Sequence, residues 1–340
     1  MAVESKNSSL AKARDAKQDE FYTQLSDIEK ELKNYKKYFK GKVVYCNCDD
    51  PRVSGFFHYF SYNFEKLGLK KLIATCYKSD KRDLFSANDS DKAIMLQYTG
   101  DKNKVPEPNE IGIVKLNGDG DFRSEESIEL LKQADIVVTN PPFSLFREFI
   151  NQLFYYDKKF IVVGSKNAIT YKEIFSLIKD NRMWLGNGFS AGNAYFKIPP
   201  KNARNYANGV YDKTTGLVKF RNVGWFTNLD IAKRHEELIL FKDYDENNYP
   251  RYVNYDAIEV GTVKDIPRYY EGEMGVPITF LDIYNPDQFE IVGSSRTLSK
   301  PMSQFAEKGS FSQGGPRFYL KNTDGTYRRM YDRLVIRKRK

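Results

Sequence analysis

The chain has 340 residues, of which 41% are hydrophobic and 29% charged, and its formal net charge is +9. No apolar run reaches the roughly 18 to 20 residues that a membrane helix needs, and residues 1–10 lack the basic-then-apolar order of a secretory signal. These features argue against a membrane or exported protein. We expect a cytoplasmic, soluble protein with one large domain and one smaller region.

Cysteine and histidine usage argues against a disulfide framework and against a metal centre. The three cysteines, Cys46, Cys48 and Cys76, are a small and odd number for a long chain, so we expect them to be reduced. With only His58 and His235 in the chain, a zinc site lacks ligands. The excess positive charge suits a phosphate backbone as partner, and the many Tyr and Phe rings offer surfaces on which bases can stack.

The first elements in chain order are an arm and a helix. Residues 1–19 are polar and basic without an apolar period, which predicts a mobile arm. From residue 20 to Gly41 apolar residues recur at helical spacing, namely Ile28, Leu32, Tyr35 and Phe39. We predict an amphipathic helix. Glu31 within it resembles part of a nuclease motif, but a charged helix face is the better interpretation.

A strand, a helix and a second strand follow. Residues 42–46 and 71–77 are short apolar runs, and residues 52–67 between them have a helical pattern. This order predicts parallel pairing with helices on both faces of the sheet. Residues 93–98 and 111–116 alternate apolar and polar side chains, which predicts an antiparallel excursion from that sheet.

The same alternation returns in the middle of the chain. A helix is predicted at residues 125–133, and the strand-like run 135–139 ends at Asn140-Pro141-Pro142-Phe143, because two prolines cannot continue a central strand. A helix at 145–155, a strand at 160–164 and a helix at 171–180 complete the pattern. It is typical of a doubly wound, mostly parallel α/β domain.

The second half of the chain is less regular. Beyond residue 186 the composition shifts to Asn, Gly, Tyr and basic residues, and strand-like pieces at 217–220, 223–228 and 237–241 predict a β-rich region. Residues 328–340 gather Arg and Lys around a short apolar run. We interpret this tail as a solvated charge run, with phosphate contact as the alternative.

Polar residues follow several predicted strands, at the sheet edge where open α/β sheets bind ligands. Asp49 and Asp50 follow the first strand, Asp119 and Asp121 follow the antiparallel excursion, and Asn140 follows strand 135–139. We therefore expect the functional site at this edge.

Asn140-Pro141-Pro142-Phe143 has a specific chemical interpretation. An amine conjugated to a base ring is a poor nucleophile until its lone pair leaves the ring. The Asn140 side-chain oxygen and the Pro141 carbonyl can each accept one amine hydrogen, while the prolines hold these acceptors rigid and Phe143 stacks on the base. The base must first leave the duplex. The alternative is a proline-rich turn that only ends the strand.

Longer runs around this signature resemble the EcoRI-type adenine-specific DNA methyltransferases. The resemblance spans residues 19–292 and is carried by the segments 19–23 (DEFYT), 45–53 (YCNCDDPRV), 118–124 (GDGDFRS), 140–143 (NPPF), 225–230 (WFTNLD) and 274–281 (MGVPITFL). It implies a Rossmann-like methyltransferase sheet with an appended β-rich target-recognition region. It also implies transfer of a methyl group from S-adenosylmethionine to N6 of a flipped-out adenine in duplex DNA, as part of a restriction-modification or related system.

The resemblance also assigns cofactor residues. Phe21, Tyr22 and Thr23 would line the methionine end of S-adenosylmethionine, Asp49 or Asp50 would face its amino group, and Asp121 and Phe122 would meet its adenine. Asn47, Cys76, Tyr77 and Asn140 complete the implied cofactor set. Two features depart from the family pattern: the glycine-rich turn after the first strand is absent, and Cys76 and Tyr77 stand where an acidic residue often binds the ribose. Phe21 to Thr23 could instead be the apolar lead-in to a helix.

We expect an arm at 1–19, a catalytic domain at 20–186, target recognition at 187–280, and a C-terminal region with a basic tail at 281–340. An alternative role for some strands of 187–280 is to complete the catalytic sheet. Candidates for DNA contacts are Lys201, Arg204, Arg221 and Lys264. The expected enzyme is a monomer without a metal requirement. The alternatives are methylation of cytosine N4 or of RNA, and a DNA-binding module without catalysis.

Overall fold

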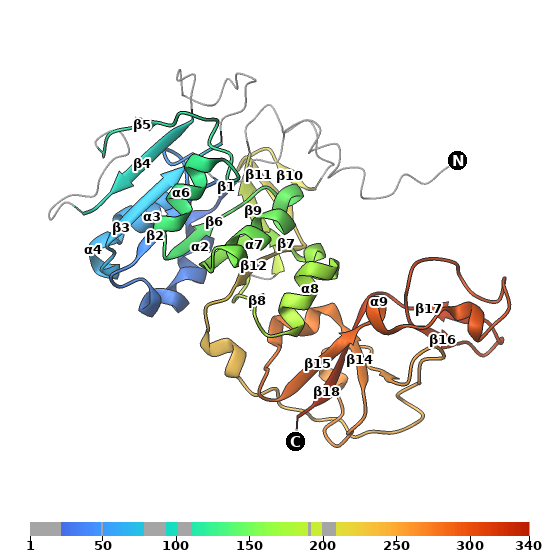
Figure 1. Ribbon diagram of the computed structural model, residues 1–340. Coiled ribbons are helices and arrows are strands. Elements are labelled where there is room, and N and C mark those ends of the chain that lie inside the picture. The colour runs from blue at the N-terminus through green and yellow to red at the C-terminus, as the bar shows by residue number, and fades with distance from the viewer. Residues whose placement is uncertain are drawn as a thin grey trace. The chain divides into compact units, whose positions relative to one another are not determined.

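The computed structural model describes residues 22–48, 50–77, 93–100, 111–189, 192–198 and 209–339 (Figure 1). The chain divides into two compact units, Met1–Ile174 with Met183–Leu229, and Phe175–Arg182 with Asp230–Lys340. Within the described residues no helix is both long enough and apolar enough to cross a membrane. The predicted arm and four predicted site residues lie outside the described residues, namely Phe21, Asp49, Lys201 and Arg204.

A mixed eight-stranded sheet forms the centre of the first unit, in the order β5-β4-β3-β2-β6-β7-β12-β8. Its strands are β2 (Val43–Cys46), β3 (Lys71–Thr75), β4 (Ile94–Tyr98), β5 (Val114–Lys115), β6 (Ile136–Thr139), β7 (Lys159–Ser165), β8 (Trp184–Leu185) and β12 (Val223–Thr227). The central strands β3, β2, β6 and β7 pair in parallel. The remaining pairings, toward both edges, are antiparallel.

The prediction of a mostly parallel sheet is therefore correct for the centre and wrong for the edges. The excursion through β4 and β5 is antiparallel, as expected. At the other edge β12 returns to β7 after a long segment that contains both helices and short strands, and β8 pairs with β12. An antiparallel pair does not need the crossover connection that joins parallel strands.

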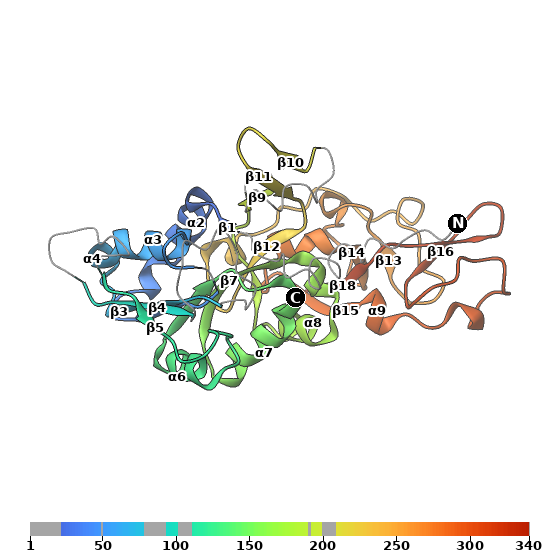
Figure 2. The ribbon, with the colours of Figure 1, turned by 90° about the horizontal axis from the view of Figure 1, so that it is seen from above.

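Helices cover the sheet and confirm the predicted α/β alternation. They are α2 (Leu25–Leu32), α3 (Gly55–Tyr62), α4 (Phe64–Leu67), α6 (Glu125–Gln133) and α7 (Phe146–Tyr155), with 3-10 helices at Lys33–Tyr38, Phe143–Leu145 and Lys166–Thr170. The boundary between the two units falls within the next helix, α8 (Lys172–Lys179). Figure 2 shows α2 and α3 on one side of the sheet and α6 and α7 on the other. Both faces of the central strands are consequently buried, and Val44, Tyr45 and Val137 are fully buried.

The amphipathic helix predicted near the N-terminus is confirmed, although its last turns are a 3-10 helix. Ile28, Leu32, Tyr35 and Phe39 are all fully buried. The interpretation of Glu31 as part of a charged helix face is wrong, because its side chain is also fully buried. Its carboxylate accepts hydrogen bonds from the Tyr35 hydroxyl at 2.8 Å and from the backbone N–H groups of Asn187 at 2.9 Å and Gly188 at 3.0 Å. Glu31 therefore fixes the turn that follows β8.

A second, four-stranded sheet of the first unit has the order β1-β9-β11-β10. Its strands are β1 (Tyr22–Thr23), β9 (Ala194–Lys197), β10 (Tyr211–Asp212) and β11 (Leu217–Phe220). Thr23 of β1 lies opposite Phe196 of β9 in an antiparallel pair. Tyr22 and Thr23 thus form a strand, and the helix begins only at Leu25.

The second unit contains a four-stranded sheet in the order β13-β14-β18-β15. Its elements are β13 (Ile258–Glu259), β14 (Met274–Pro277), β15 (Phe289–Ser294), α9 (Ser295–Leu298) and β18 (Arg333–Lys338), with the hairpin β16 (Tyr319–Lys321) and β17 (Tyr327–Arg329). Its 3-10 helices are Ala232–His235, Val263–Asp265, Ile278–Ile283 and Met302–Gln304.

Two predictions in this unit are wrong. The basic tail is not a solvated charge run, because Leu334, Val335 and Ile336 are buried and β18 is a central strand of the sheet. The predicted strand at residues 237–241 is also absent, because these residues form no strand in the structure. The Gln288 side chain takes the place of a partner strand there: it accepts from the Leu238 N–H at 2.9 Å and donates to the Leu238 carbonyl at 2.7 Å.

Candidate active site

The strand order of the large sheet reverses between β2 and β6. The chain passes from β2 to β3 on one side, and β6 then pairs with the other side of β2. In open α/β sheets such a switch point opens a crevice at the carboxyl ends of the strands. Here those ends are followed by Asn47 after β2 and by Asn140 after β6. The structure therefore brings two of the predicted site residues to the switch point.

The Asn-Pro-Pro-Phe segment leaves β6 as a mostly buried turn. Thr139 is fully buried, Asn140 is 7% exposed, and Pro141 is buried as well. Phe143 begins a 3-10 helix that leads directly into α7. Its ring is half-buried and meets Phe196 edge to face, with ring centroids 6.4 Å apart. This turn holds an amide and a proline carbonyl beside an aromatic ring in a region largely closed to water.

The small sheet brings the Tyr22-Thr23 strand to the same place. Thr23 pairs with Phe196, and Phe196 contacts the Phe143 ring. The first residue of α3, Gly55, closes the arrangement from the β2 side, because a Cβ atom there would lie 2.9 Å from the Thr23 carbonyl oxygen. Among the described residues, the buried Thr23 hydroxyl has no hydrogen-bond partner. A ligand with polar groups would satisfy it.

A carboxylate and a guanidinium face each other after β2. The Asp50 carboxylate accepts from Arg52 Nε at 2.9 Å and also from Arg52 Nη2, and both side chains are 16% exposed. The hydrogen bond to Asp50 raises the pKa of Arg52, and the nearby Cys76 and Tyr22 groups add to that increase. Arg52 therefore lies near Cys76, which follows β3, and near Tyr22 of β1. Asn47, just before Asp50, is 3% exposed.

The Asp121 loop packs on the end of β3. Gly120 has a φ of +75°, and a Cβ atom there would lie 2.2 Å from the Cys76 carbonyl oxygen, so the close approach requires glycine. Cys76 is buried and Tyr77 is 40% exposed. The loop that carries Asp121 therefore packs directly on Cys76.

The side chains of this loop have partners within the protein. Hydrogen bonds from Arg123 Nε at 2.8 Å and Nη2 at 2.6 Å lower the pKa of Asp121, so its carboxylate stays ionised. Phe122 is 5% exposed and packs edge to face on Phe149, with ring centroids 5.1 Å apart. Of Asp121 and Phe122, Asp121 is therefore the more accessible, and Phe122 anchors the loop by packing on Phe149.

Sequence reasoning missed a row of aromatic rings behind Phe143. Phe189 lies 6.2 Å from Phe196 and stacks on Trp225 at 5.5 Å, and Trp225 meets Phe56 at 6.0 Å. The apolar run from Ala194 to Phe196 was a usable sequence signal for β9. Its pairing with β1, more than a hundred residues earlier, was not visible in the sequence.

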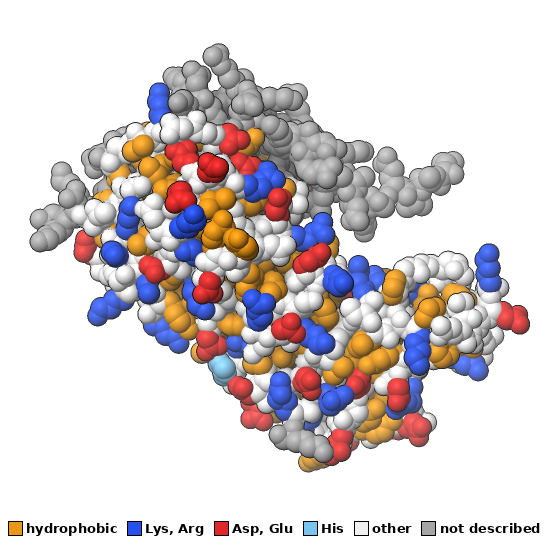
Figure 3. Space-filling view, in the orientation of Figure 1, with side chains coloured by type: hydrophobic (Ala, Val, Ile, Leu, Met, Phe, Trp, Pro, Cys, Tyr) orange, Lys and Arg blue, Asp and Glu red, His pale blue; other side chains and the backbone are white. Residues whose placement is uncertain are grey.

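The predicted DNA contacts are less concentrated than the predicted catalytic residues. Of the described candidates, Arg221 is exposed between β11 and β12 in the first unit, and Lys264 is exposed on a 3-10 helix of the second unit. Figure 3 shows Lys and Arg interspersed with Asp and Glu on the face that it presents. Charge alone therefore does not locate a nucleic-acid surface. Over the described part of the chain, no group of three or more His, Cys, Asp or Glu could hold a metal ion.

Comparison with known proteins gives matches over most of the chain. The family model for the adenine-specific methyltransferase EcoRI matches residues 9–339. The chain is 50% identical over 296 residues to the Type II methyltransferase M.EcoRI of Escherichia coli, which covers 86% of this chain and 90% of that protein.

Two relatives from mycoplasmas are similar over comparable lengths. Type II methyltransferase M.MgeORF184P of Mycoplasma genitalium is 40% identical over 344 residues, covering 96% of this chain and 98% of that protein. Type II methyltransferase M.MpnI of Mycoplasma pneumoniae is 38% identical over 291 residues, covering 83% and 84%. No solved structure matches the chain.

Proposed function

The chain belongs to the family of EcoRI-type adenine-specific methyltransferases and is a site-specific DNA methyltransferase, and from this premise we propose that it methylates adenine N6 at the switch point between β2 and β6. The observation that carries the proposal is the position of Asn140-Pro141-Pro142-Phe143 at that point, next to Tyr22 and Thr23 through Phe196. The family supplies the reaction class, and the site supplies residues for it.

Asn140 and Pro141 activate the amine. The Asn140 Oδ1 atom and the Pro141 carbonyl oxygen accept the two hydrogens of N6, which turns the nitrogen lone pair out of the ring and toward the methyl donor. Because Asn140 is 7% exposed, few water molecules compete for these hydrogen bonds. Pro141 and Pro142 restrict the backbone, so the two acceptors keep their positions.

Phe143 holds the everted base by stacking. Eversion costs roughly a few kcal/mol, and stacking together with the two hydrogen bonds offsets that cost. Phe196 supports the Phe143 ring from its edge, and Phe189 supports Phe196 in turn. We expect this row of rings to keep the pocket open for a flat aromatic ligand.

The residues at the switch point fit S-adenosylmethionine. When bound, it supplies a methyl group on a sulfonium, which is an electrophile for the amine. The Thr23 hydroxyl is buried without a partner among the described residues, and the polar groups of Asn47, Asp50 and Asp121 gather at the same sheet edge. These residues, with Tyr22, Cys76, Tyr77 and Phe122 and with Phe21 and Asp49 outside the described residues, would hold the cofactor.

Asp50 and Arg52 match the amino-acid end of that cofactor. An α-amino acid carries one ammonium and one carboxylate, and the pair offers one group of the opposite sign to each. Arg52 can bind a carboxylate through two N–H groups, and Asp50 can accept from an ammonium. The carbonyl oxygen of Thr23, which the resemblance assigns to the same end, packs against Gly55, three residues after Arg52. This pairing offsets the missing glycine-rich turn.

We place the enzyme in the bacterial cytoplasm, where its duplex DNA substrate lies, and in a restriction-modification or related system, as the Type II names of its relatives suggest. The testing experiment incubates the chain with S-adenosylmethionine carrying a labelled methyl group and with defined duplexes, followed by digestion to nucleosides. We expect the label in N6-methyl-2′-deoxyadenosine. Label in N4-methylcytosine, or only in an RNA substrate, would contradict the proposal. Absence of heat on titration with S-adenosylmethionine would instead indicate a binding module.

A further inference from the structure

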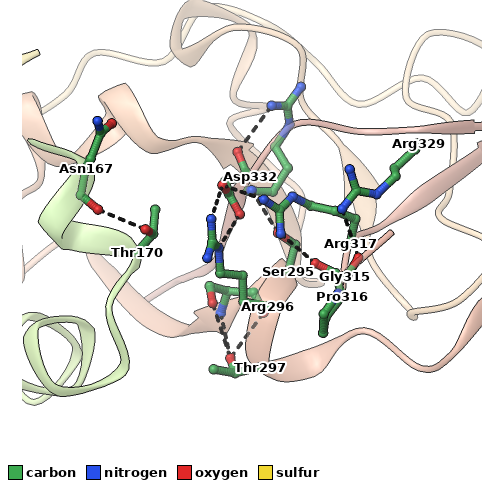
Figure 4. Close-up of polar contacts among 12 residues, drawn as sticks. Asn167, Thr170, Ser295, Arg296, Thr297, Gly315, Pro316, Arg317, Arg329 and Asp332 are labelled. Carbon is green, nitrogen blue, oxygen red and sulfur yellow. Dashed lines mark hydrogen bonds and ion pairs between the residues drawn. The ribbon is translucent and has the colours of Figure 1, made fainter. Parts of the chain in front are cut away.

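A cluster of arginines surrounds a single carboxylate in the second unit. Figure 4 shows Arg296 and Arg317 directed at Asp332, with Arg329 next to Gly315. Asp332 accepts from Arg296 Nε at 2.8 Å and Nη2 at 3.0 Å, and from Arg317 Nη2 at 2.9 Å. Arg329 Nη2 donates to the Gly315 carbonyl at 2.9 Å. Four segments meet here: α9, the loop before β16, the end of β17 and the residue before β18.

The cluster has more positive charge than its carboxylate balances. Three guanidinium groups and one carboxylate leave an excess of two positive charges. Burial lowers the pKa of Arg317, and repulsion from Arg296 and Arg329 lowers it further, against the attraction of Asp332. Repulsion among guanidinium groups held this close together destabilises the fold, and binding of an anion would relieve it.

A nearby ion pair shows what a purely structural arginine looks like in this unit. Arg333 donates from Nε at 3.0 Å and from Nη2 at 2.7 Å to Glu259, one guanidinium to one carboxylate. The two side chains are 10% and 8% exposed. By contrast, the Arg296 side chain is 42% exposed, and the Gly314-Gly315-Pro316 turn beside Arg317 is exposed too. Arg296 therefore faces solvent, where a ligand can reach it, whereas the Arg317 side chain beside it is only 15% exposed.

We propose that Arg296, Arg317 and Arg329 bind a phosphate of the duplex DNA substrate, with Asp332 holding the guanidinium groups in position. A guanidinium binds phosphate through parallel N–H groups, and a carboxylate that fixes its orientation reduces the entropy lost on binding. Phosphate contacts position a protein on the duplex without reading its sequence. The cluster is thus an anchor for DNA on the second unit, separate from the residues that read the target. This inference rests on the proposed function.

The test measures DNA binding by the full chain as a function of salt. A fluorescein-labelled duplex reports affinity by anisotropy from about 50 to about 200 mM NaCl, and each lost phosphate contact should lower the magnitude of the salt slope by about 0.9. Arg296→Ala should show this decrease together with weaker binding at low salt. Arg296→Lys should retain part of the slope, because lysine binds phosphate as a point charge.

The matched control is Arg268→Ala. Arg268 is an exposed arginine of the same unit, paired one-to-one with Asp243, and its loss changes net charge by the same amount. It should leave the slope unchanged. Equal slopes for wild type and Arg296→Ala, or equal changes in Arg296→Ala and Arg268→Ala, would overturn the inference. Thermal unfolding of each variant shows whether the fold is retained.

Two further arms separate the sources of a negative result. If pyrophosphate competition at constant ionic strength is lost in Arg296→Ala while the DNA slope is kept, the cluster binds a small anion, and the assignment to DNA is overturned. If wild type neither binds nor methylates any duplex, the proposed function itself fails. If wild type methylates DNA and the slope of Arg296→Ala is unchanged, only the anchor fails.

Discussion

The two units organise their polar groups in different ways. In the first unit the central strands β2 and β6 are buried along their whole length, and polar side chains gather where β2, β3 and β6 end. In the second unit charged side chains are part of the sheet itself, because Arg333 of β18 and Glu259 of β13 form a buried ion pair. Substitutions at strand ends can change the site without altering the fold. Substitution of a charged residue within a sheet changes the stability of that sheet. We therefore expect substitutions to affect activity in the first unit and stability in the second.

The largest expected effect is on chemistry in the first unit. Asn140→Ala should lower the rate of methyl transfer by at least about 100-fold, because one of the two acceptors for N6 is lost. Cofactor affinity, measured by calorimetry, should change little. Loss of cofactor binding in this variant would indicate that Asn140 supports the structure. It would contradict the claim that substitutions at the strand ends of the first unit leave the fold intact.

In the second unit the largest expected effect is on stability. Arg333→Ala leaves the Glu259 carboxylate buried without its partner, which should lower the free energy of unfolding by roughly 3 to 5 kcal/mol. Arg333→Lys should cost less, because a cation remains. Denaturant unfolding of both variants measures the difference. An unchanged denaturation midpoint for Arg333→Ala would mean that this ion pair does not stabilise the second unit, and it would contradict the proposed difference between the two units.

A more specific effect is expected for the cofactor. Arg52→Ala should weaken binding of S-adenosylhomocysteine by roughly 10- to 100-fold, because hydrogen bonds to a charged group are lost. Binding of methylthioadenosine, which lacks the amino-acid end, should not change. Calorimetry with both ligands gives the comparison. Equal losses for the two ligands would indicate that Arg52 acts only through the fold of the Asp50 turn.

The smallest expected effect is on the pH dependence of the stability of the second unit. The hydrogen bonds of His235 to Asp287 and to Asp230, both at 2.9 Å, raise its pKa above the ordinary value of 6.5, with Arg234 sharing Asp230. Its contribution is fully present below the unfolded pKa and is lost as pH rises through the higher folded pKa. Since the ring is exposed, the contribution should stay below about 1 kcal/mol.

Thermal unfolding at a series of pH values tests this expectation. The wild type should lose slightly more stability than His235→Gln as pH rises above 6.5. Parallel pH profiles for the two proteins would show that the imidazolium does not stabilise the unit.

The same contrast explains how much the sequence could predict. The central strands and their helices follow from local patterns, so β2, β3, β6 and β7 were found close to their observed bounds. β18 was missed because its stability comes from β14 and β15, which are distant in sequence, and because basic residues flank its short buried run from Leu334 to Ile336. Glu31 was misjudged for a related reason, since its partners lie at Asn187 and Gly188.

The candidate site follows the same rule. Asn140 and Asp50 could be placed at strand ends from the sequence, because the strands themselves were predictable. The neighbourhood of Phe143, Phe196 and Thr23 depends on the pairing of β1 with β9, which no local pattern contains.

The central claim is that Asn140 and Pro141 together hold the amine of an everted adenine. It is tested most directly by a structure of the chain bound to S-adenosylhomocysteine and to a duplex whose methylated base has been mapped. We predict that adenine N6 lies at about 2.9 Å from both Asn140 Oδ1 and the Pro141 carbonyl oxygen. A target base bound elsewhere, with Asn140 contacting neither nucleotide nor cofactor, would contradict the account.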